Sequence, residues 1–106
     1  MPKFLLQGSY TAEGLKGLAK DKATGRKASV TAALQTAGVM VESFYFSFGS
    51  DDVVLIVDAP DNATATAVSI AVSSTGLISL HTTPLLTATE VDAALAKKVT
   101  YTPPGR

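Results

Sequence analysis

Runs of apolar residues predict four β-strands in this chain. They lie at residues 3–10, 39–48, 53–57 and 77–86, and each run is rich in β-branched, aromatic or leucine side chains. Residues 49–52 read Gly-Ser-Asp-Asp, which is the turn chemistry of an antiparallel hairpin. The second and third strands are therefore expected to be hairpin neighbours in one sheet.

The segment between the first two strands predicts two helical pieces. Thr11 supplies an N-cap hydroxyl for the first piece, which Gly14 and Gly17 weaken by about 1 kcal/mol each relative to alanine. Residues 20–25 are expected to form a polar connector, and Gly38 is placed to end the second piece in a left-handed conformation. The inward face of the second piece has apolar residues at helical spacing, namely Val30, Ala33, Leu34 and Ala37.

Capping signals predict two further helices. Asp61 is the expected N-cap of one, and Thr87 and Glu90 form the pattern of a capping box for the other. Their inward faces are expected to be Ala63, Ala67, Ile70 and Ala71 in the first helix, and Val91, Ala94 and Leu95 in the second. Residues 98–106 contain proline and glycine and are expected to form an extended tail.

The predicted order of elements is β-α-β-β-α-β followed by a C-terminal helix. This is the order of a ferredoxin-like α+β fold, in which helices cover one face of a four-stranded antiparallel sheet. A chain of 106 residues is long enough for one domain, and no low-complexity linker or long internal repeat divides it. We therefore expect a single domain over residues 1–106.

The predicted sheet is apolar on both faces, which favours assembly. Val53, Leu55 and Val57 of the third strand point to one face, and Val54 and Ile56 to the other. Strict alternation divides the second strand in the same way, with Phe44, Phe46 and Phe48 in one set and Val39, Val41 and Tyr45 in the other. Because small helices can cover only one face, we expect a homodimer or higher homo-oligomer, built as a dimeric α+β barrel. Cover by the chain's own C-terminal tail is the alternative.

Composition and charge exclude several classes of protein. The chain has no cysteine, which excludes disulfides, cysteine-ligated metals and cysteine nucleophiles. Nine basic residues balance nine acidic ones, which argues against nucleic acid as a partner. No apolar run approaches the ~20 residues that span a membrane, and the start of the chain lacks a signal-peptide core. We expect a cytoplasmic protein with no membrane partner.

The charges are nevertheless unevenly distributed. No Lys or Arg lies between residues 28 and 96, whereas seven acidic residues do. The basic residues gather toward the two ends, and those around the first helices include Lys16, Lys20, Lys22, Arg26 and Lys27. This separation could steer subunits or an anionic ligand toward the first helices, although a solvated helix surface is the more common meaning of such a pattern.

His81 is the candidate catalytic residue. It is the only histidine and the only side chain expected to titrate near neutral pH without help. It shares a strand face with Ser79 and Thr83, where it could act as a general base, orient a ligand or serve as an axial haem ligand. A hydrogen-bonded structural histidine is the more common role. A chain with a single histidine and no cysteine cannot form a multi-histidine metal site by itself. We expect no metal and no cofactor.

Tyr10, Tyr45 and Asp51, together with His81, are the candidate ligand-binding residues. The tyrosine hydroxyls could orient a small ligand, although strand tyrosines belong more often to a core or an interface. Asp51 and Asp52 are adjacent, so their side chains would point to opposite faces and are poorly placed to share a proton. Asp51 is expected instead to hydrogen-bond backbone N–H groups in the turn.

The opening, two central segments and the ending of the chain together resemble a known family. They are MPKFLLQGSYTAEG at residues 1–14, FYFSFG at 44–49, the run at 52–62 and VTYTPPG at 99–105. These segments resemble the GYD domain family of small bacterial proteins. Gly49, Ser50 and Asp51 stand where the family name implies Gly-Tyr-Asp, so a hydroxyl replaces the name-giving aromatic side chain. The resemblance implies a dimeric α+β barrel and supplies no reaction.

Three functions are compatible with these features. The first is a dimer that binds a small molecule in or beside the barrel. The second is a cofactor-independent isomerase or oxygenase that acts through His81 with Tyr45 or Tyr10. The third is a purely structural assembly protein. The first two require a cavity, of at least about 300 Å³ for a drug-sized ligand, and the third requires none.

Overall fold

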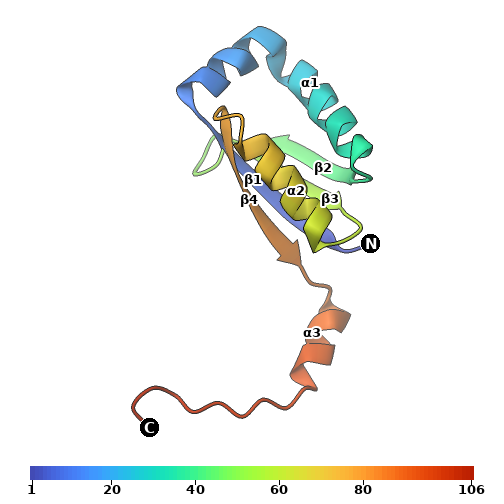
Figure 1. The fold of residues 1–106 in the computed structure, drawn as a ribbon, viewed down its shortest axis with the longest axis vertical. Coiled ribbons are helices and arrows are strands. Elements are labelled where there is room, and N and C mark those ends of the chain that lie inside the picture. The colour runs from blue at the N-terminus through green and yellow to red at the C-terminus, as the bar shows by residue number, and fades with distance from the viewer.

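The computed structural model describes residues 1–106 as one sheet covered by two helices, with a C-terminal arm that extends away from them (Figure 1). The elements in chain order are β1 (Lys3–Tyr10), α1 (Ala12–Thr36), β2 (Met40–Phe46), β3 (Val53–Asp58), α2 (Asn62–Ser73), β4 (Ile78–Leu85) and α3 (Ala88–Leu95). This confirms the predicted order. β2 and β4 are one or two residues shorter at each end than the apolar runs that predict them.

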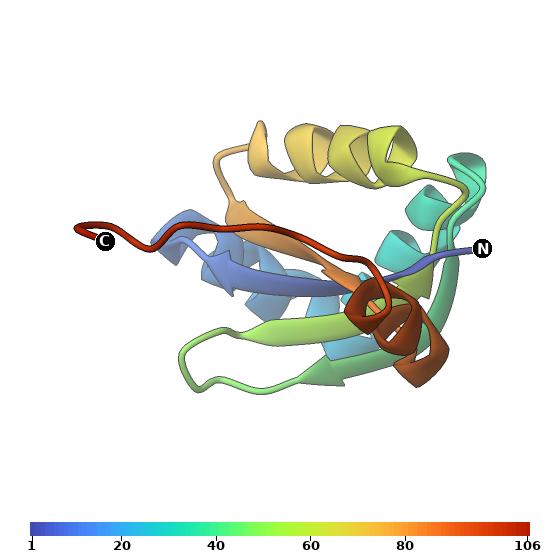
Figure 2. The same cartoon turned by 90° about the horizontal axis from the view of Figure 1, so that it is seen from below.

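The four strands form one antiparallel sheet in the order β2-β3-β1-β4. β1 is central, so Leu6 pairs with Leu55 of β3 on one side and with Thr82 of β4 on the other. α1 and α2 both lie over one face of the sheet, and Figure 2 shows α2 as a layer above the strands. The fold is therefore α+β and ferredoxin-like, as predicted.

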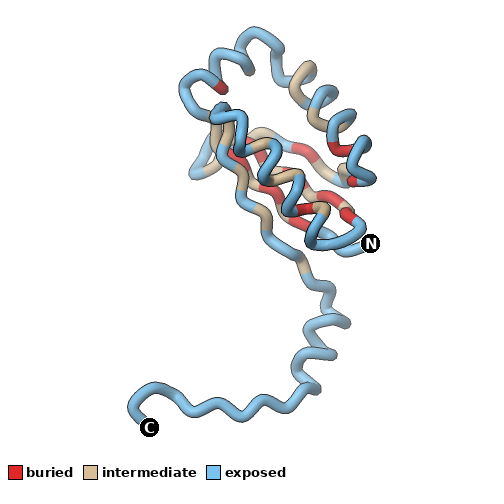
Figure 3. Tube along the Cα trace, viewed as in Figure 1, coloured by how far each residue is buried: buried red, intermediate tan, exposed pale blue.

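The hydrophobic core lies between this covered face and the helices. Its buried residues are Phe4, Leu6, Leu34, Val39, Phe44, Val53, Leu55, Val57, Ala59 and Ala65. Figure 3 shows how the buried positions are concentrated in the strands beneath the helices. The opposite face carries no helix, and we call it the open face. Its residues include Leu5, Gln7, Tyr45, Val54, Ile56 and His81.

α1 consists of two helical pieces that meet at Lys22, where φ is 68° and ψ is 160°. The prediction of two pieces is confirmed, and their junction lies within the predicted connector at residues 20–25, but it is only one residue long. Only Lys22 is non-helical within those residues, so polarity alone does not indicate a loop there. Thr11 caps the first piece by accepting a hydrogen bond from the N–H of Gly14 at 3.2 Å. Gly38 has the expected left-handed conformation, with φ 74°.

α2 faces the sheet with residues other than those predicted. Asp61 caps it as expected and accepts a hydrogen bond from the N–H of Thr64 at 2.7 Å. The inward residues are Ala65, Val68 and Val72. The predicted set of Ala63, Ala67, Ile70 and Ala71 is exposed. Small residues occur on several sides of this helix, so alanine spacing does not define its inward face.

β2 does not alternate strictly between the two faces. A register shift between Val41 and Ser43 places Val41 against the core together with Phe46. The predicted placement of Val41 beside Tyr45 is therefore wrong, because a β-bulge reverses the alternation beyond it. Phe48 also lies outside the strand, with φ 50°, and is 57% exposed.

α3 has the predicted start but not the predicted packing. Its capping box is complete: Thr87 Oγ1 accepts from the N–H of Glu90 at 3.1 Å, and Glu90 Oε1 accepts from the N–H of Thr87 at 3.0 Å. No residue of α3 is buried. The predicted inward placement of Val91, Ala94 and Leu95 is therefore wrong. The tail that follows is also exposed throughout, so it does not cover the chain's own open face (Figure 3).

Candidate functional site: a cavity beneath the helices

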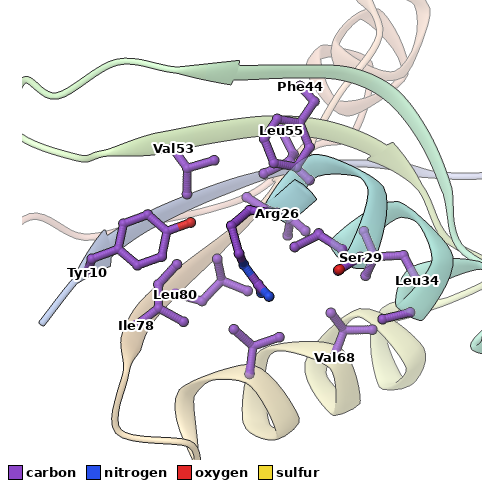
Figure 4. Close-up of a pocket in the computed structure, with 14 residues that line it drawn as sticks. Tyr10, Arg26, Ser29, Leu34, Phe44, Val53, Leu55, Val68, Ile78 and Leu80 are labelled. Atoms are coloured by element: carbon purple, nitrogen blue, oxygen red, sulfur yellow. The ribbon is translucent and has the colours of Figure 1, made fainter. Parts of the chain in front are cut away.

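A cavity of about 160 Å³ lies between the sheet and the two covering helices (Figure 4). Its walls are almost entirely apolar. The strands contribute residues such as Leu55 and Ile78, α2 contributes Val68, and the second piece of α1 contributes Val30 and Leu34. The cavity forms because α1 rises away from the sheet at its kink and returns toward it near Leu34 (Figure 1).

Three polar side chains line this cavity, and two of them come from opposite sides of it. Tyr10 stands at the end of β1, while Arg26 and Ser29 belong to the second piece of α1. In Figure 4 the Tyr10 hydroxyl and the Arg26 guanidinium both point into the space between sheet and helices. A hydroxyl and a cation therefore converge in otherwise apolar surroundings, which is the usual composition of a small-molecule site.

The Tyr10 hydroxyl is held in its neutral form. Burial raises the pKa of Tyr10 above its ordinary value of 10.0, because a phenolate loses hydration there. The positive charge of Arg26 lowers the same pKa and so opposes burial, while the carboxylate of Asp52 raises it. Tyr10 can consequently offer its hydroxyl as a hydrogen-bond donor over the physiological pH range.

The salt bridge of Arg26 within the chain is long. Its guanidinium donates to Asp21 Oδ2 at 3.4 Å, which is a long contact, and the Arg26 side chain is 34% exposed. An arginine carries five N–H donors, so most of its hydrogen-bonding capacity is available to a ligand. Asp21 sits before the kink and Arg26 after it, so this contact also spans the junction of the two pieces of α1.

The Asp51–Asp52 pair holds the β2–β3 loop against β1. Asp51 Oδ1 accepts a hydrogen bond from the Ser9 hydroxyl at 3.1 Å, and Asp52 Oδ2 accepts one from the backbone N–H of Tyr10 at 2.8 Å. The turn itself is closed by the Asp51 carbonyl, which accepts from the N–H of Gly49 at 3.0 Å. Residues 49–52 do form the predicted turn, but the prediction that the Asp51 side chain binds backbone N–H groups there is wrong, because its carboxylate accepts from the Ser9 hydroxyl of β1 instead. The pair fixes the end of the strand that carries Tyr10.

His81 and Tyr45 lie on the open face and are far from each other. Pairing places Tyr45, Val54, Gln7 and His81 in one row across the four strands. Three strand spacings of about 4.8 Å separate the two ends of the row by roughly 14 Å. Both residues are exposed. Within one chain, these two side chains cannot act on the same small molecule.

The four predicted ligand-binding residues are thus divided among three places. Tyr10 lines the cavity, Asp51 braces the loop beside it, and Tyr45 and His81 stand on the opposite face of the sheet. No group of three or more His, Asp or Glu side chains is arranged to hold a metal ion. Arg26 lines the cavity but is not among the predicted ligand-binding residues. The concentration of positive charge around the first helices is the signal that includes it.

The fold and the cavity define this molecule as a ferredoxin-like α+β protein with a small, mostly apolar internal site. Residues 4–95 match the GYD domain, so the chain belongs to the GYD domain family. This confirms the resemblance drawn from the sequence. No match to the chain is found among curated proteins or among solved structures. No helix is long and apolar enough to span a membrane.

Proposed function

We propose that this protein binds a small apolar molecule that carries one carboxylate, with the apolar part in the cavity and the carboxylate between Arg26 and Tyr10. The convergence of these two side chains in an apolar cavity is the observation that carries the proposal. An arginine fork and a neutral hydroxyl donor are both suited to carboxylate oxygens.

The size of the cavity limits the ligand. At about 160 Å³ it is smaller than the 300 Å³ expected for a drug-sized molecule. It is close to the volume of roughly 150 Å³ at which an apolar protein cavity accepts benzene. The proposed ligand is therefore a single ring or a short branched chain with its acid group, such as a benzoate-sized molecule.

Asp21 competes with the ligand for Arg26. A carboxylate that enters the cavity replaces the long 3.4 Å contact between the two residues with a better one. Removing the Asp21 charge should consequently strengthen binding of an anion, while binding of a neutral molecule of the same shape should change little.

Calorimetric titration with benzoate and with benzyl alcohol tests the proposal. We expect benzoate to bind more tightly, Arg26→Gln to remove this preference, and Tyr10→Phe to weaken benzoate binding. Lys27→Gln and Tyr45→Phe are the controls, because the first removes one positive charge and the second one phenol hydroxyl, each from an exposed position outside the cavity. Asp21→Asn should increase the affinity for benzoate.

A cavity-filling variant separates binding in the cavity from binding on the surface. Val68 projects into the cavity from α2 (Figure 4), so Val68→Phe should occupy the space that the ring of benzoate needs. Benzoate that still binds Val68→Phe with unchanged affinity would contradict the proposed site. Equal losses in Arg26→Gln and Lys27→Gln would show that only overall charge matters.

We also propose that a second copy of the chain covers the open face. Leu5, Val54 and Ile56 at its centre are only half-buried in the single chain, and Tyr45 beside them is 70% exposed. Contiguous apolar surface of this kind is uncommon on monomers. Sedimentation equilibrium should show a homodimer that Ile56→Lys dissociates, whereas Thr66→Lys on the outer side of α2 leaves it intact. A monomer at all accessible concentrations would exclude this assembly.

A further inference from the structure

The C-terminal arm, residues 86–106, is an apolar element without a surface to pack on. All of its residues are exposed, among them Leu86, Val91, Leu95, Val99 and Tyr101. The radius of gyration is 16.9 Å, against about 13 Å for a compact domain of this length, because the arm extends from the body (Figure 1).

The helix within the arm is too short to be stable by itself. α3 has eight residues, and isolated helices of fewer than about 12 residues are marginal in water. The capping box satisfies only its first turn. Val91 and Leu95 are four residues apart and form an apolar stripe on one side of α3, with exposed fractions of 42% and 78%. This stripe needs a partner surface to stabilise the helix.

The open face of the sheet is the complementary uncovered surface. Its apolar centre is Leu5, Val54 and Ile56. At the end of the sheet where β4 stops, Glu42 and Asp58 share the single ammonium group of Lys3, at 2.7 Å and 2.9 Å. Within this cluster, two carboxylates face one ammonium group.

The arm matches that surface in charge as well as in polarity. Lys97 and Lys98 follow α3 directly, and Arg106 ends the chain. An arm that lays its apolar stripe on the open face can bring these basic residues to the cluster of Glu42 and Asp58, where opposite charges fix the register of docking.

The direction of the chain keeps the arm away from its own sheet. Only Leu86 and Thr87 separate β4 from α3, and Thr87 is extended, with φ −75° and ψ 162°. The capping box holds this geometry, so α3 continues outward from the end of β4 (Figure 1). Reaching its own open face would require the chain to reverse within two residues and break the cap.

We propose that the arm of each chain crosses the open face of a second copy, with α3 packed over Val54 and Ile56, so that two chains exchange arms about a two-fold axis. A two-fold arrangement covers both open faces and both arms at once. This inference rests on the proposed homodimer and names the segment that completes it. The cavity under the helices lies on the other side of the sheet and is not involved.

Single substitutions in the full chain test the exchange. Leu95→Lys should raise the dimer dissociation constant at least about tenfold, as expected when a buried apolar anchor is lost. Thr89→Lys adds the same charge to α3 outside the stripe and should change the constant by less than about twofold. If Leu95→Lys dimerises as tightly as wild type while Ile56→Lys does not, the arm exchange fails and the homodimer stands.

Cross-linking identifies which chain the arm contacts. The protein has no cysteine, so the double variant Leu95→Cys with Ile56→Cys introduces the only two thiols. Oxidation should give covalent dimers on a non-reducing gel, and a mixture of the two single variants should give cross-linked heterodimers. A disulfide formed within one chain would overturn the proposal. Leu95→Cys with Thr66→Cys is the control and should remain largely unlinked.

Discussion

The two faces of the sheet are built from similar residues and differ in what covers them. Along β3, Val53, Leu55 and Val57 are 1–3% exposed beneath the helices, whereas the residues between them, Val54 and Ile56, are only half-buried. Both sets consist only of valine, leucine and isoleucine. The two sets are equally apolar, so hydrophobicity does not distinguish the two sides of β3, and the connections of the chain decide which side its own helices cover.

The cavity of about 160 Å³ lies on the covered face. The helices approach the strands closely at Leu34 and Ala65 and leave space near the kink of α1. A face formed within one chain can thus be incompletely packed and still bury a core. The open face carries no helix, and the proposed second copy of the chain would cover it.

The largest loss of stability should come from truncating a residue on the covered face, and truncating its neighbour on the open face should cost less. Leu55→Ala removes a buried side chain and should lower the free energy of unfolding by about 2–5 kcal/mol. Ile56→Ala should cost less than half as much in dilute solution, because this side chain is only half-buried. Urea denaturation at low protein concentration measures both.

The stability losses of Leu55→Ala and Ile56→Ala should depend differently on protein concentration. The cost of Ile56→Ala should grow as protein concentration rises into the range where the wild type dimerises, since mass action then stabilises the wild type more. The cost of Leu55→Ala should not. Equal costs for both substitutions at every concentration would show that the two faces are covered alike.

Two glycines of α1 test how closely the covering helix approaches the sheet. A methyl group at Gly14 would overlap the carbonyl oxygen of Leu77, whereas one at Gly17 would meet nothing. Gly14→Ala should therefore destabilise the protein by about 1–3 kcal/mol. Gly17→Ala should stabilise it by about 0.5–1 kcal/mol, because alanine favours a helix. Thermal unfolding of both variants provides the measurement. A higher melting temperature in both would contradict the close contact between Gly14 and Leu77.

Titration with alkali distinguishes a tyrosine on the covered face from one on the open face. The pKa of Tyr10 is raised above 10.0 by burial, so the unfolded chain releases this proton first and stability should fall as pH rises from 10 toward the raised pKa. Ultraviolet absorbance should show that Tyr10→Phe removes the last part of tyrosinate formation. Tyr45→Phe is the control, and loss of that last part in Tyr45→Phe instead would contradict the assignment.

The smallest effect is expected at the start of α2. The N–H of Thr64 lowers the pKa of Asp61 below 3.8, so Asp61 contributes stability above that pH and the contribution is lost as pH falls through the lowered value. Melting temperatures of wild type and Asp61→Asn should therefore converge slightly on acidification from pH 5. Unchanged differences between the two proteins over this range would show that the carboxylate charge is not used.

The sequence predicts the helices and strands of this fold better than it predicts which side of each helix packs against the sheet. Caps at Thr11, Asp61 and Thr87 locate all three helix starts, because a capping side chain acts within its own turn. The inward faces of α2 and α3 are predicted wrongly. Facing depends on contacts with distant segments, and alanine-rich helices carry only a weak pattern.

The candidate site is predicted only at Tyr10. Arg26 reaches the cavity because α1 is helical through residues 23–26 and thereby turns this side chain toward the sheet. The predicted connector at those residues would not define the direction of the Arg26 side chain. The bulge in β2 is equally invisible in the sequence, since one extra residue changes the face of every position before it.

Lys22 has an unfavourable backbone conformation in the helix that covers the cavity. Its φ of 68° and ψ of 160° lie in a backbone region that glycine normally occupies, so the junction in α1 is the least favourable point of the helix that covers the cavity. Arg26, Val30 and Leu34 all follow that junction and line the cavity. The backbone angles of one strained residue therefore set how far this wall of the cavity stands from the sheet.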